Sequence, residues 1–301
     1  MKVIITGFFD QNGKSSLQDS MNKAVKHGID TLALRRFSGQ PLLECTDGEL
    51  KKIIMDTKGE RIKLSLIDTE IMPYDPYDDR KHANALDEFK YLLKVSDKLK
   101  VNHVLLRLPI INNVIEEFDT IEKRLGDYVD QAMRSSKKVI LMPVSGYKAN
   151  TYAYILKKMK SKHLSVAFDP VLTMMNNESA TTSYRLLRSY ISAIFVHDAN
   201  HQGNPELLGF GKSDVLKILK KLQRHRFDGF IMVDHHFGST VFQEVEQKQS
   251  FFKKLLSNDK KKKETQLREL SRRIFPDEET KNVTEDDIYD NQIKLIQSVF
   301  K

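Results

Sequence analysis

The chain has 301 residues, 40% of them hydrophobic, which is enough to bury one large core of the size that α/β barrels use. It has no run of about 18 apolar residues, and residues 1–10 lack the pattern of a signal peptide, so we expect a cytoplasmic protein with no membrane partner. The single cysteine, Cys45, excludes an intrachain disulfide, and the net charge of +8 is too dispersed for a dedicated nucleic-acid-binding domain.

Short apolar runs alternate with longer segments of helical periodicity through most of the chain. The runs have the length and composition of buried parallel strands, and the segments between them carry apolar residues three and four apart, as Leu17, Met21 and Ala24 do. The eight predicted strands are Val3 to Thr6, Thr31 to Leu34, Lys63 to Leu66, His103 to Arg107, Lys138 to Met142, Ser165 to Phe168, Ile194 to Val196 and Gly229 to Val233. Because alternating strands and helices form parallel sheets, eight such units predict a (β/α)8 TIM barrel, with an open doubly wound sheet as the alternative.

The composition changes toward the C-terminus. A charged stretch around the lysine run Lys260 to Lys263 precedes two segments with an apolar stripe, and Thr284 with Asp287 forms a variant of the capping box before the second. The stripes consist of Leu267, Leu270 and Ile274, and of Ile288, Leu295, Ile296, Val299 and Phe300. We therefore predict a barrel over residues 1–256 and a C-terminal extension, a charged linker with helices, over 257–301. The extension packs on the barrel or joins two subunits in a homo-oligomer.

In a (β/α)8 barrel the active site lies at the carboxyl ends of the strands, and polar residues cluster there in this sequence. They are Arg35 and Arg36 after the second strand, Asp68 and Glu70 after the third, Arg107 at the fourth, Asp169 at the sixth, His197 and Asp198 after the seventh, and Asp234, His235 and His236 after the eighth. The three arginines predict a cradle for a phosphate or carboxylate, with salt bridges to Glu44 or Asp68 as the alternative. Adjacent strand residues face opposite sides, so at most one of His235 and His236 joins Asp234.

Two longer stretches carry a resemblance to a known family. The stretch "GIDTLALRRFSGQPLLECTDGEL", Gly28 to Leu50, resembles the second strand, its loop and the next helix start in the sugar phosphate isomerase/epimerase superfamily, the xylose isomerase-like barrels. The stretch "LGFGKSDVLKILKKLQRHRFDGFIMVDHH", Leu208 to His236, is similar to that family's closing segment, and "MKVIITGFF" to its opening. The resemblance covers about residues 1 to 250 and leaves out the C-terminal helices.

The family holds a divalent metal with a Glu on strand five, an Asp on strand six, a His on strand seven and a Glu on strand eight. The resemblance assigns these positions to Met142, Asp169, Phe195 and Asp234, so that only the strand-six residue is unchanged. A thioether has little affinity for a hard ion, and a phenyl ring has none. A further family His, in the strand-six motif, falls on Leu172.

His197 offers a partial replacement, because side chains two residues apart on a strand share a face and His197 points the same way as Phe195. Asp169, His197 and Asp234 then form a degenerate three-ligand site for Mn²⁺, Mg²⁺ or Zn²⁺, weak or absent because of Met142 and Phe195. The alternative is a metal-free site in which these side chains bond one another.

The resemblance implies an isomerase or epimerase of carbohydrate metabolism that acts on a sugar or sugar phosphate by proton transfer next to a carbonyl. Two alternatives remain: a metal-free, non-catalytic relative that binds a carbohydrate or phosphorylated ligand, and an endonuclease IV-like repair enzyme, for which the strand ends lack the His and Glu set. The expected catalytic residues are Asp234 and Asp169, and the expected substrate-binding residues are Arg35, Arg36, Arg107, His197, Asp198 and His236.

Overall fold

The structure is a computed structural model and describes residues 3–10, 15–234, 236–242, 265, 267–278 and 281–300, without the side chains of 236, 239 and 240. The predicted domain boundary at 256 and the lysine run Lys260 to Lys263 lie outside the described residues. None of the helices in the described residues is long and apolar enough to cross a membrane.

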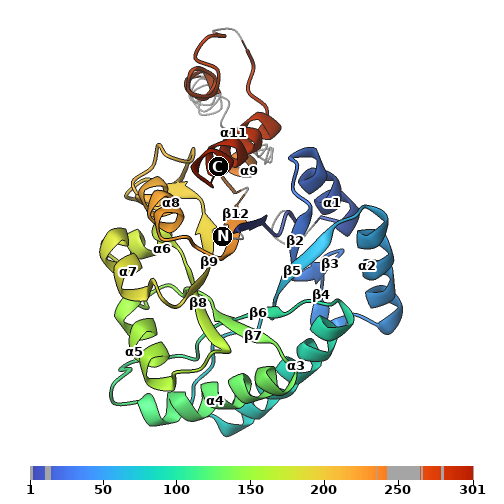
Figure 1. The fold of residues 1–301 in the computed structure, drawn as a ribbon, viewed down its shortest axis with the longest axis vertical. Coiled ribbons are helices and arrows are strands. Elements are labelled where there is room, and N and C mark those ends of the chain that lie inside the picture. The colour runs from blue at the N-terminus through green and yellow to red at the C-terminus, as the bar shows by residue number, and fades with distance from the viewer. Residues whose placement is uncertain are drawn as a thin grey trace, which may run out of the picture.

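Eight parallel strands form a ring, which confirms the predicted (β/α)8 barrel (Figure 1). In chain order they are β1 (Val3–Thr6), β2 (Thr31–Leu34), β5 (Lys63–Asp68), β6 (His103–Leu106), β7 (Lys138–Leu141), β8 (Leu164–Phe168), β9 (Ile191–Val196) and β12 (Gly229–Val233). They pair in the order β1-β12-β9-β8-β7-β6-β5-β2. The two end strands meet at the carboxyl end, where the amide of Ala33 donates to the carbonyl of Gly7 at 2.9 Å. This contact excludes the open doubly wound sheet, whose edge strands lie far apart.

Helices surround the ring on its outer side (Figure 1). They are α1 (Leu17–Lys26), α2 (Asp47–Gly59), α3 (Asp79–Lys98), α4 (Phe118–Arg134), α5 (Ala149–Met159), α6 (Pro170–Met175), α7 (Ala180–Leu187), α8 (Val215–Arg224), α9 (His236–Phe242) and α11 (Glu285–Phe300). Residues 267–274 are also helical. The loops at the carboxyl ends hold the ribbons β3 (Arg36–Phe37) with β4 (Gln40–Pro41) and β10 (Asp198–Ala199) with β11 (Pro205–Glu206), and the short helix η1 (Leu42–Glu44).

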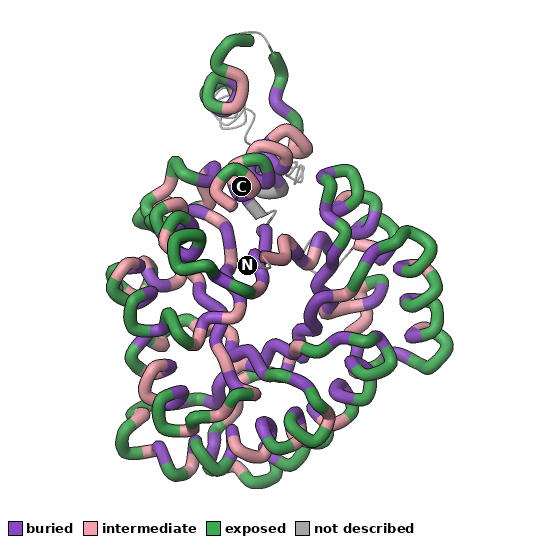
Figure 2. The backbone as a smooth tube through the Cα atoms, viewed as in Figure 1, coloured by how far each residue is buried: buried purple, intermediate pink, exposed green. Residues whose placement is uncertain are grey.

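Successive side chains of a strand point to opposite faces, so the strands contribute to two apolar layers. The buried strands lie inside a largely exposed outer surface (Figure 2). The outer layer packs the strands against the helices. The inner layer fills the barrel and consists of Ile4, Phe8, Ala33, Leu66, Leu105, Ile140, Met142, Ala167, Ala193, Phe195, Phe230 and Met232. Because side chains two residues apart face the same way, the next inward positions at the carboxyl end are Arg35, Asp68, Arg107, Asp169, His197 and Asp234.

The C-terminal helix α11 packs on the barrel of its own chain, in contact with α8 and α9 (Figure 1). Its buried residues Tyr289, Ile293 and Ile296 belong to the same core as the barrel helices. Lys23 on α1 pairs with Glu285 at 2.8 Å, and Lys26 pairs with Asp286. Thus α11 lies between α8 and α1, the position of the helix that follows β12 in a closed barrel.

The predicted capping box before α11 is present. The Thr284 amide donates to Asp287 Oδ2 at 2.9 Å, and the Asp287 amide donates to Thr284 Oγ1 at 3.2 Å. The apolar face of α11 is covered within the chain, and the homo-oligomer stays a prediction.

Candidate functional site at the carboxyl ends of the strands

Three titratable side chains meet at the ends of β8, β9 and β12. Asp169 ends β8 and caps α6, where Pro170 occupies the first helical position and the Leu172 amide donates to Asp169 Oδ1 at 3.0 Å. His197 Nε2 lies 3.0 Å from the same oxygen, and His197 Nδ1 lies 3.7 Å from Asp234 Oδ2. The imidazole therefore stands between two carboxylates, and we call Asp169, His197 and Asp234 the mouth triad.

The electrostatics of the mouth triad favour a charged imidazole. Burial would lower the pKa of His197, but the charge of Asp169, its hydrogen bond and the charges of Asp234 and Asp198 raise the pKa to about 9. Burial would raise the pKa of Asp169, but the charge and hydrogen bond of His197 and the amide of Leu172 lower it. At neutral pH the site thus holds an imidazolium between two carboxylates.

The donor set does not fit the divalent metal that the resemblance implies. Both ring nitrogens of His197 face carboxylates, whereas a metal ligand needs a neutral imidazole with a free lone pair. Met142 and Phe195 pack in the apolar inner layer of the barrel, where the family has charged or imidazole ligands. Among the described residues no group of three His, Cys, Asp or Glu side chains is placed to hold an ion. The three expected ligands converge, but His197 is hydrogen-bonded to Asp169 and faces Asp234 with its other ring nitrogen.

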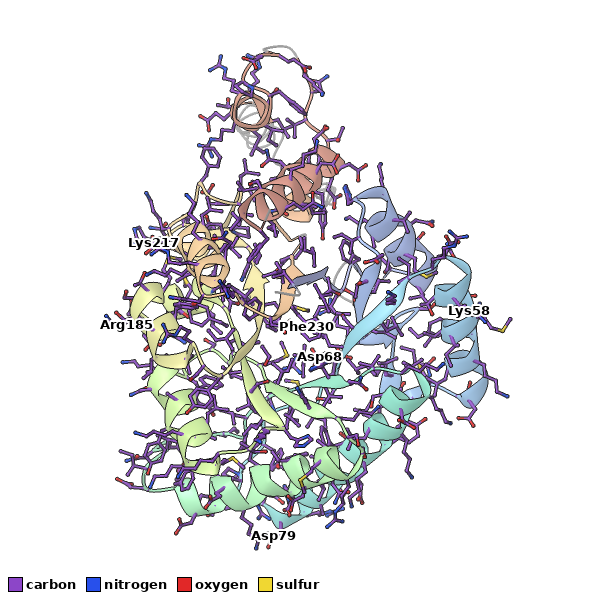
Figure 3. All side chains as sticks on the ribbon, in the orientation of Figure 1. Lys58, Asp68, Asp79, Arg185, Lys217 and Phe230 are labelled. Atoms are coloured by element: carbon purple, nitrogen blue, oxygen red, sulfur yellow. The ribbon has the colours of Figure 1, made fainter. Side chains whose placement is uncertain are left out.

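The arginines at the mouth are all paired with carboxylates. Arg107 donates to both oxygens of Asp68 at 2.8 and 2.9 Å, which is the salt bridge expected as the alternative to an anion cradle. Asp68 is 2% exposed and lies in the centre of the ring of strands (Figure 3). The mouth is therefore charge-balanced on this side, and the Arg107 guanidinium is fixed by a forked contact.

Two further pairs were not predicted. Arg35 donates through Nε to Asp10 at 2.6 Å and lies over the ring of Phe8, with 4.7 Å to its centroid. Arg36 donates to Glu70 at 3.0 Å. The sequence shows that acidic residues are present but not which arginine each one meets. The partners follow different strands, and only the closed barrel brings them together.

Asp198 was expected to bind substrate, and the structure places it elsewhere. Its side chain is 4% exposed and faces the loop at 207–214. Oδ2 accepts the amides of Gly209 and Gly211 at 3.0 Å, and Oδ1 accepts the Ser213 hydroxyl at 2.7 Å. A Cβ at Gly211 would lie 2.2 Å from Asp198 Oδ1, so the loop needs glycine there. The expectation is corrected because Asp198, next to inward-facing His197, points the other way.

One more residue of the expected site, His236, and the single cysteine remain to be placed. The His236 side chain lies outside the described residues, and His236 begins α9. Cys45 is buried, and burial with the charges of Glu49 and Glu44 raises the pKa of its thiol to about 11, which excludes a thiolate nucleophile at neutral pH.

The comparisons with known proteins agree with the barrel fold. A family model described as xylose isomerase-like TIM barrel matches residues 21–255. No curated protein matches the sequence. The IOLI protein with a binding zinc atom superposes with a TM-score of 0.69 at 15% identity, covering 100% of this chain and 98% of its own.

Two more solved structures share the fold. The D-psicose 3-epimerase with D-tagatose from Clostridium cellulolyticum H10 has a TM-score of 0.63 at 16% identity, covering 88% of this chain and 97% of its own. A xylose isomerase-like TIM barrel protein from Mycobacterium smegmatis, in complex with magnesium, has a TM-score of 0.64 at 9% identity, covering 100% of this chain and 98% of its own. The chain belongs to the xylose isomerase-like TIM barrel family.

Proposed function

We propose that the protein binds a small sugar at the carboxyl-end mouth of the barrel and moves a proton at the carbon next to its carbonyl, without a divalent metal. The observation that carries the proposal is the mouth triad, in which His197 lies 3.0 Å from Asp169 and 3.7 Å from Asp234. Sugar isomerisation and epimerisation both begin with loss of that proton, which calls for a carboxylate base and a donor to the carbonyl oxygen.

The geometry suggests a role for each member of the mouth triad. Asp234, whose side chain is 33% exposed, is the base that takes the proton from carbon. The contact of 3.7 Å between His197 Nδ1 and Asp234 is too long for a hydrogen bond, so Nδ1–H can donate to the carbonyl oxygen as it gains negative charge. Asp169 holds His197 through Nε2. Return of the proton from Asp234 to the neighbouring carbon, while His197 passes the hydroxyl proton between the two oxygens, completes an isomerisation; an epimerisation also needs a proton donor on the opposite face of the sugar.

The arginine pairs favour an uncharged sugar over a phosphorylated one. Arg35, Arg36 and Arg107 are each engaged by a carboxylate, so a phosphate would have to displace an existing partner. A sugar hydroxyl can accept from the guanidinium edge or donate to the carboxylate without breaking the pair. Phe8, which lies against Arg35 in the inner layer, offers an aromatic face to a sugar ring.

A second candidate is a non-catalytic sugar-binding protein. Met142 and Phe195 favour it, because they are apolar at two positions where the family carries ligands and a proton carrier. The endonuclease alternative finds no support, since the part of the chain that the structure describes holds no cluster for even one metal ion.

Proton exchange separates the two candidates. The purified protein is incubated with D-tagatose or D-psicose in D₂O containing EDTA, and deuterium at the carbons next to the carbonyl is followed by NMR. We expect exchange in the wild type and a loss of about 100-fold or more in Asp234→Asn, as for other general bases. Asp214→Asn, a substitution of a half-exposed carboxylate outside the mouth, is the matched control.

The other outcomes are equally informative. Binding of a sugar, seen as line broadening, without exchange would favour the binding protein. Absence of both binding and exchange with the two sugars would contradict the proposal.

A further inference from the structure

The C-terminal helix α11 places a buried tyrosine between the loop after β1 and helix α1. Tyr289 on α11 lies beyond the family match at 21–255 and is fully buried, with 0% exposure. Its ring stacks on His27 of α1 with 4.8 Å between centroids and lies 5.6 Å from the ring of Phe9. The ammonium of Lys23 lies 5.1 Å from the centre of the Tyr289 ring.

Phe9 connects Tyr289 to the end of β12. β1 pairs with β12 up to Thr6 and Met232, and Gly7 continues along the carbonyl of Val233. A Cβ at Gly7 would lie 2.6 Å from that carbonyl and 3.0 Å from the Phe9 ring. The Phe9 ring is thus packed beside the last residue before Asp234, and Tyr289 is packed on Phe9.

The same face of α11 touches the segment after Asp234. Glu285 lies one helical turn before Tyr289, and residues four apart share a face of a helix. A Cβ at Gly238 in α9 would lie 3.0 Å from Glu285 Cγ. α9 begins two residues after Asp234, so α11 contacts the chain after this carboxylate directly and the chain before it through Phe9.

The electrostatics agree with this placement. Burial raises the pKa of Tyr289 well above its ordinary value, and the negative charges of Asp234 and Glu285 raise it further. The phenol is therefore neutral at physiological pH and lies within electrostatic reach of Asp234.

We propose that Tyr289 is a positioning residue for Asp234, and that the C-terminal helix is thereby part of the functional site. The inference rests on the proposed role of Asp234 as the base. The Tyr289 side chain, clamped between Phe9 and His27, fixes the end of β12 so that the Asp234 carboxylate faces His197 in the mouth. The site thus depends on a segment that the family match does not include.

A double-mutant cycle on stability tests the coupling without any substrate. Unfolding by urea is measured for the wild type, Tyr289→Leu, Asp234→Asn and the double mutant. Tyr289→Leu removes the ring that packs on Phe9 and His27, whereas Tyr289→Phe keeps the ring and should retain the coupling. We expect the unfolding equilibrium constant of the double mutant to differ by about three- to tenfold from the value that the two single mutants predict if their effects add.

Tyr184→Leu supplies the matched control. Tyr184 is also buried, at 2% exposure, and stacks on a histidine, His225, with 5.9 Å between centroids, but it lies on α7. Its effect should add to that of Asp234→Asn. Additive effects for Tyr289→Leu as well would overturn the proposal.

The exchange assay gives the functional readout. Tyr289→Leu should lower the exchange rate at saturating sugar by about three- to tenfold with an unchanged dissociation constant, because loss of the ring misplaces the base and leaves binding intact. Tyr184→Leu should leave both values unchanged, and an equal loss in both variants would mean a merely structural effect and would overturn the proposal. If the wild type shows no exchange, the proposed function fails, and the stability cycle still decides whether Tyr289 and Asp234 are coupled.

Discussion

At the scale of single residues, Asp198 shows how one carboxylate can organise a whole loop. Its two oxygens accept the amides of Ala199, Gly209, Gly211 and Ser213 and the Ser213 hydroxyl. This set of bonds fixes the glycine-containing loop that leads into α8. The same residue that the sequence assigned to substrate binding therefore supports the wall of the barrel.

Asp198→Asn should be strongly destabilising. An amide nitrogen would replace one acceptor oxygen and face backbone N–H donors, leaving buried groups unsatisfied at a cost of about 2 to 3 kcal/mol in the free energy of unfolding. Urea denaturation measures this loss. Asp214→Asn in the same loop, whose side chain is 51% exposed, should change the free energy by less than about 0.5 kcal/mol. Equal effects would mean that the Asp198 bonds are not formed in solution.

His103 predicts a pH dependence of stability. Its ring lies at the amino end of the barrel, packed edge-on against Phe230 with 4.9 Å between centroids. It also lines a cavity of about 570 Å³ that lies between the starts of β1, β2, β5 and β6. Burial, and then the charge of Lys138, lower the pKa of His103 to about 4.

The sign follows from the direction of this shift. Between pH 6.5 and 4 the imidazole of His103 binds a proton in the unfolded chain but not in the folded one. The contribution of neutral His103 to the free energy of unfolding is therefore complete above about pH 6.5 and is lost as the pH falls toward 4. The loss should reach about 2 kcal/mol. Urea titrations at pH 7 and pH 4.5 should show a smaller difference for His103→Phe than for the wild type. The same difference in both proteins would contradict a neutral, half-buried His103.

At the scale of elements, α11 serves as the helix that closes the barrel after β12. Ile296 is 0% exposed in the common core, and Lys294, on the same helix, is exposed. Ile296→Ala should therefore cost about 2 to 4 kcal/mol in the free energy of unfolding, whereas Lys294→Ala should cost less than about 0.5 kcal/mol. Similar small losses for both variants would show that α11 is not packed on the barrel.

The strands could be predicted from the sequence, whereas most tertiary contacts of the helices could not. β1, β2 and β12 have the predicted bounds, and β9 begins at Ile191 rather than at Ile194. An apolar run of strand length is a local signal, so periodicity finds it. An apolar stripe, such as that of α11, shows that a helix is covered but not by what. Its charged contacts with Lys23 and Lys26 join residues that are 262 and 260 positions apart.

The candidate site follows the same division. The inward positions at the strand ends follow from the two-residue period of a strand. This period predicted that Asp169, His197 and Asp234 face the same mouth, and in the structure they lie within 3.0 and 3.7 Å of one another. The resemblance to the family predicted a metal site. In the structure the imidazole of His197 lies instead between two carboxylates. Which of these states forms depends on distances of a few ångströms, and sequence spacing does not contain them.

At the scale of the whole molecule, the barrel keeps the architecture of its family and changes the centre of its mouth. In the function that we propose, His197, held by Asp169, provides part of the positive charge that a divalent ion would supply. Met142 and Phe195, at two positions that the resemblance assigns to metal ligands, pack against the apolar inner layer. The account therefore predicts a protein whose ligand chemistry is independent of metal.

Titration calorimetry with Mn²⁺ tests this central claim most directly. The wild type should bind Mn²⁺ with a Kd weaker than about 1 mM, because its imidazole is occupied and its strand-five ligand is missing. Met142→Glu adds a carboxylate beside Asp169 and should raise the affinity, and Asp169→Asn in the same chain should remove the gain. Binding of Mn²⁺ by the wild type with a Kd in the micromolar range, lost in His197→Gln, would contradict the account and establish His197 as a metal ligand.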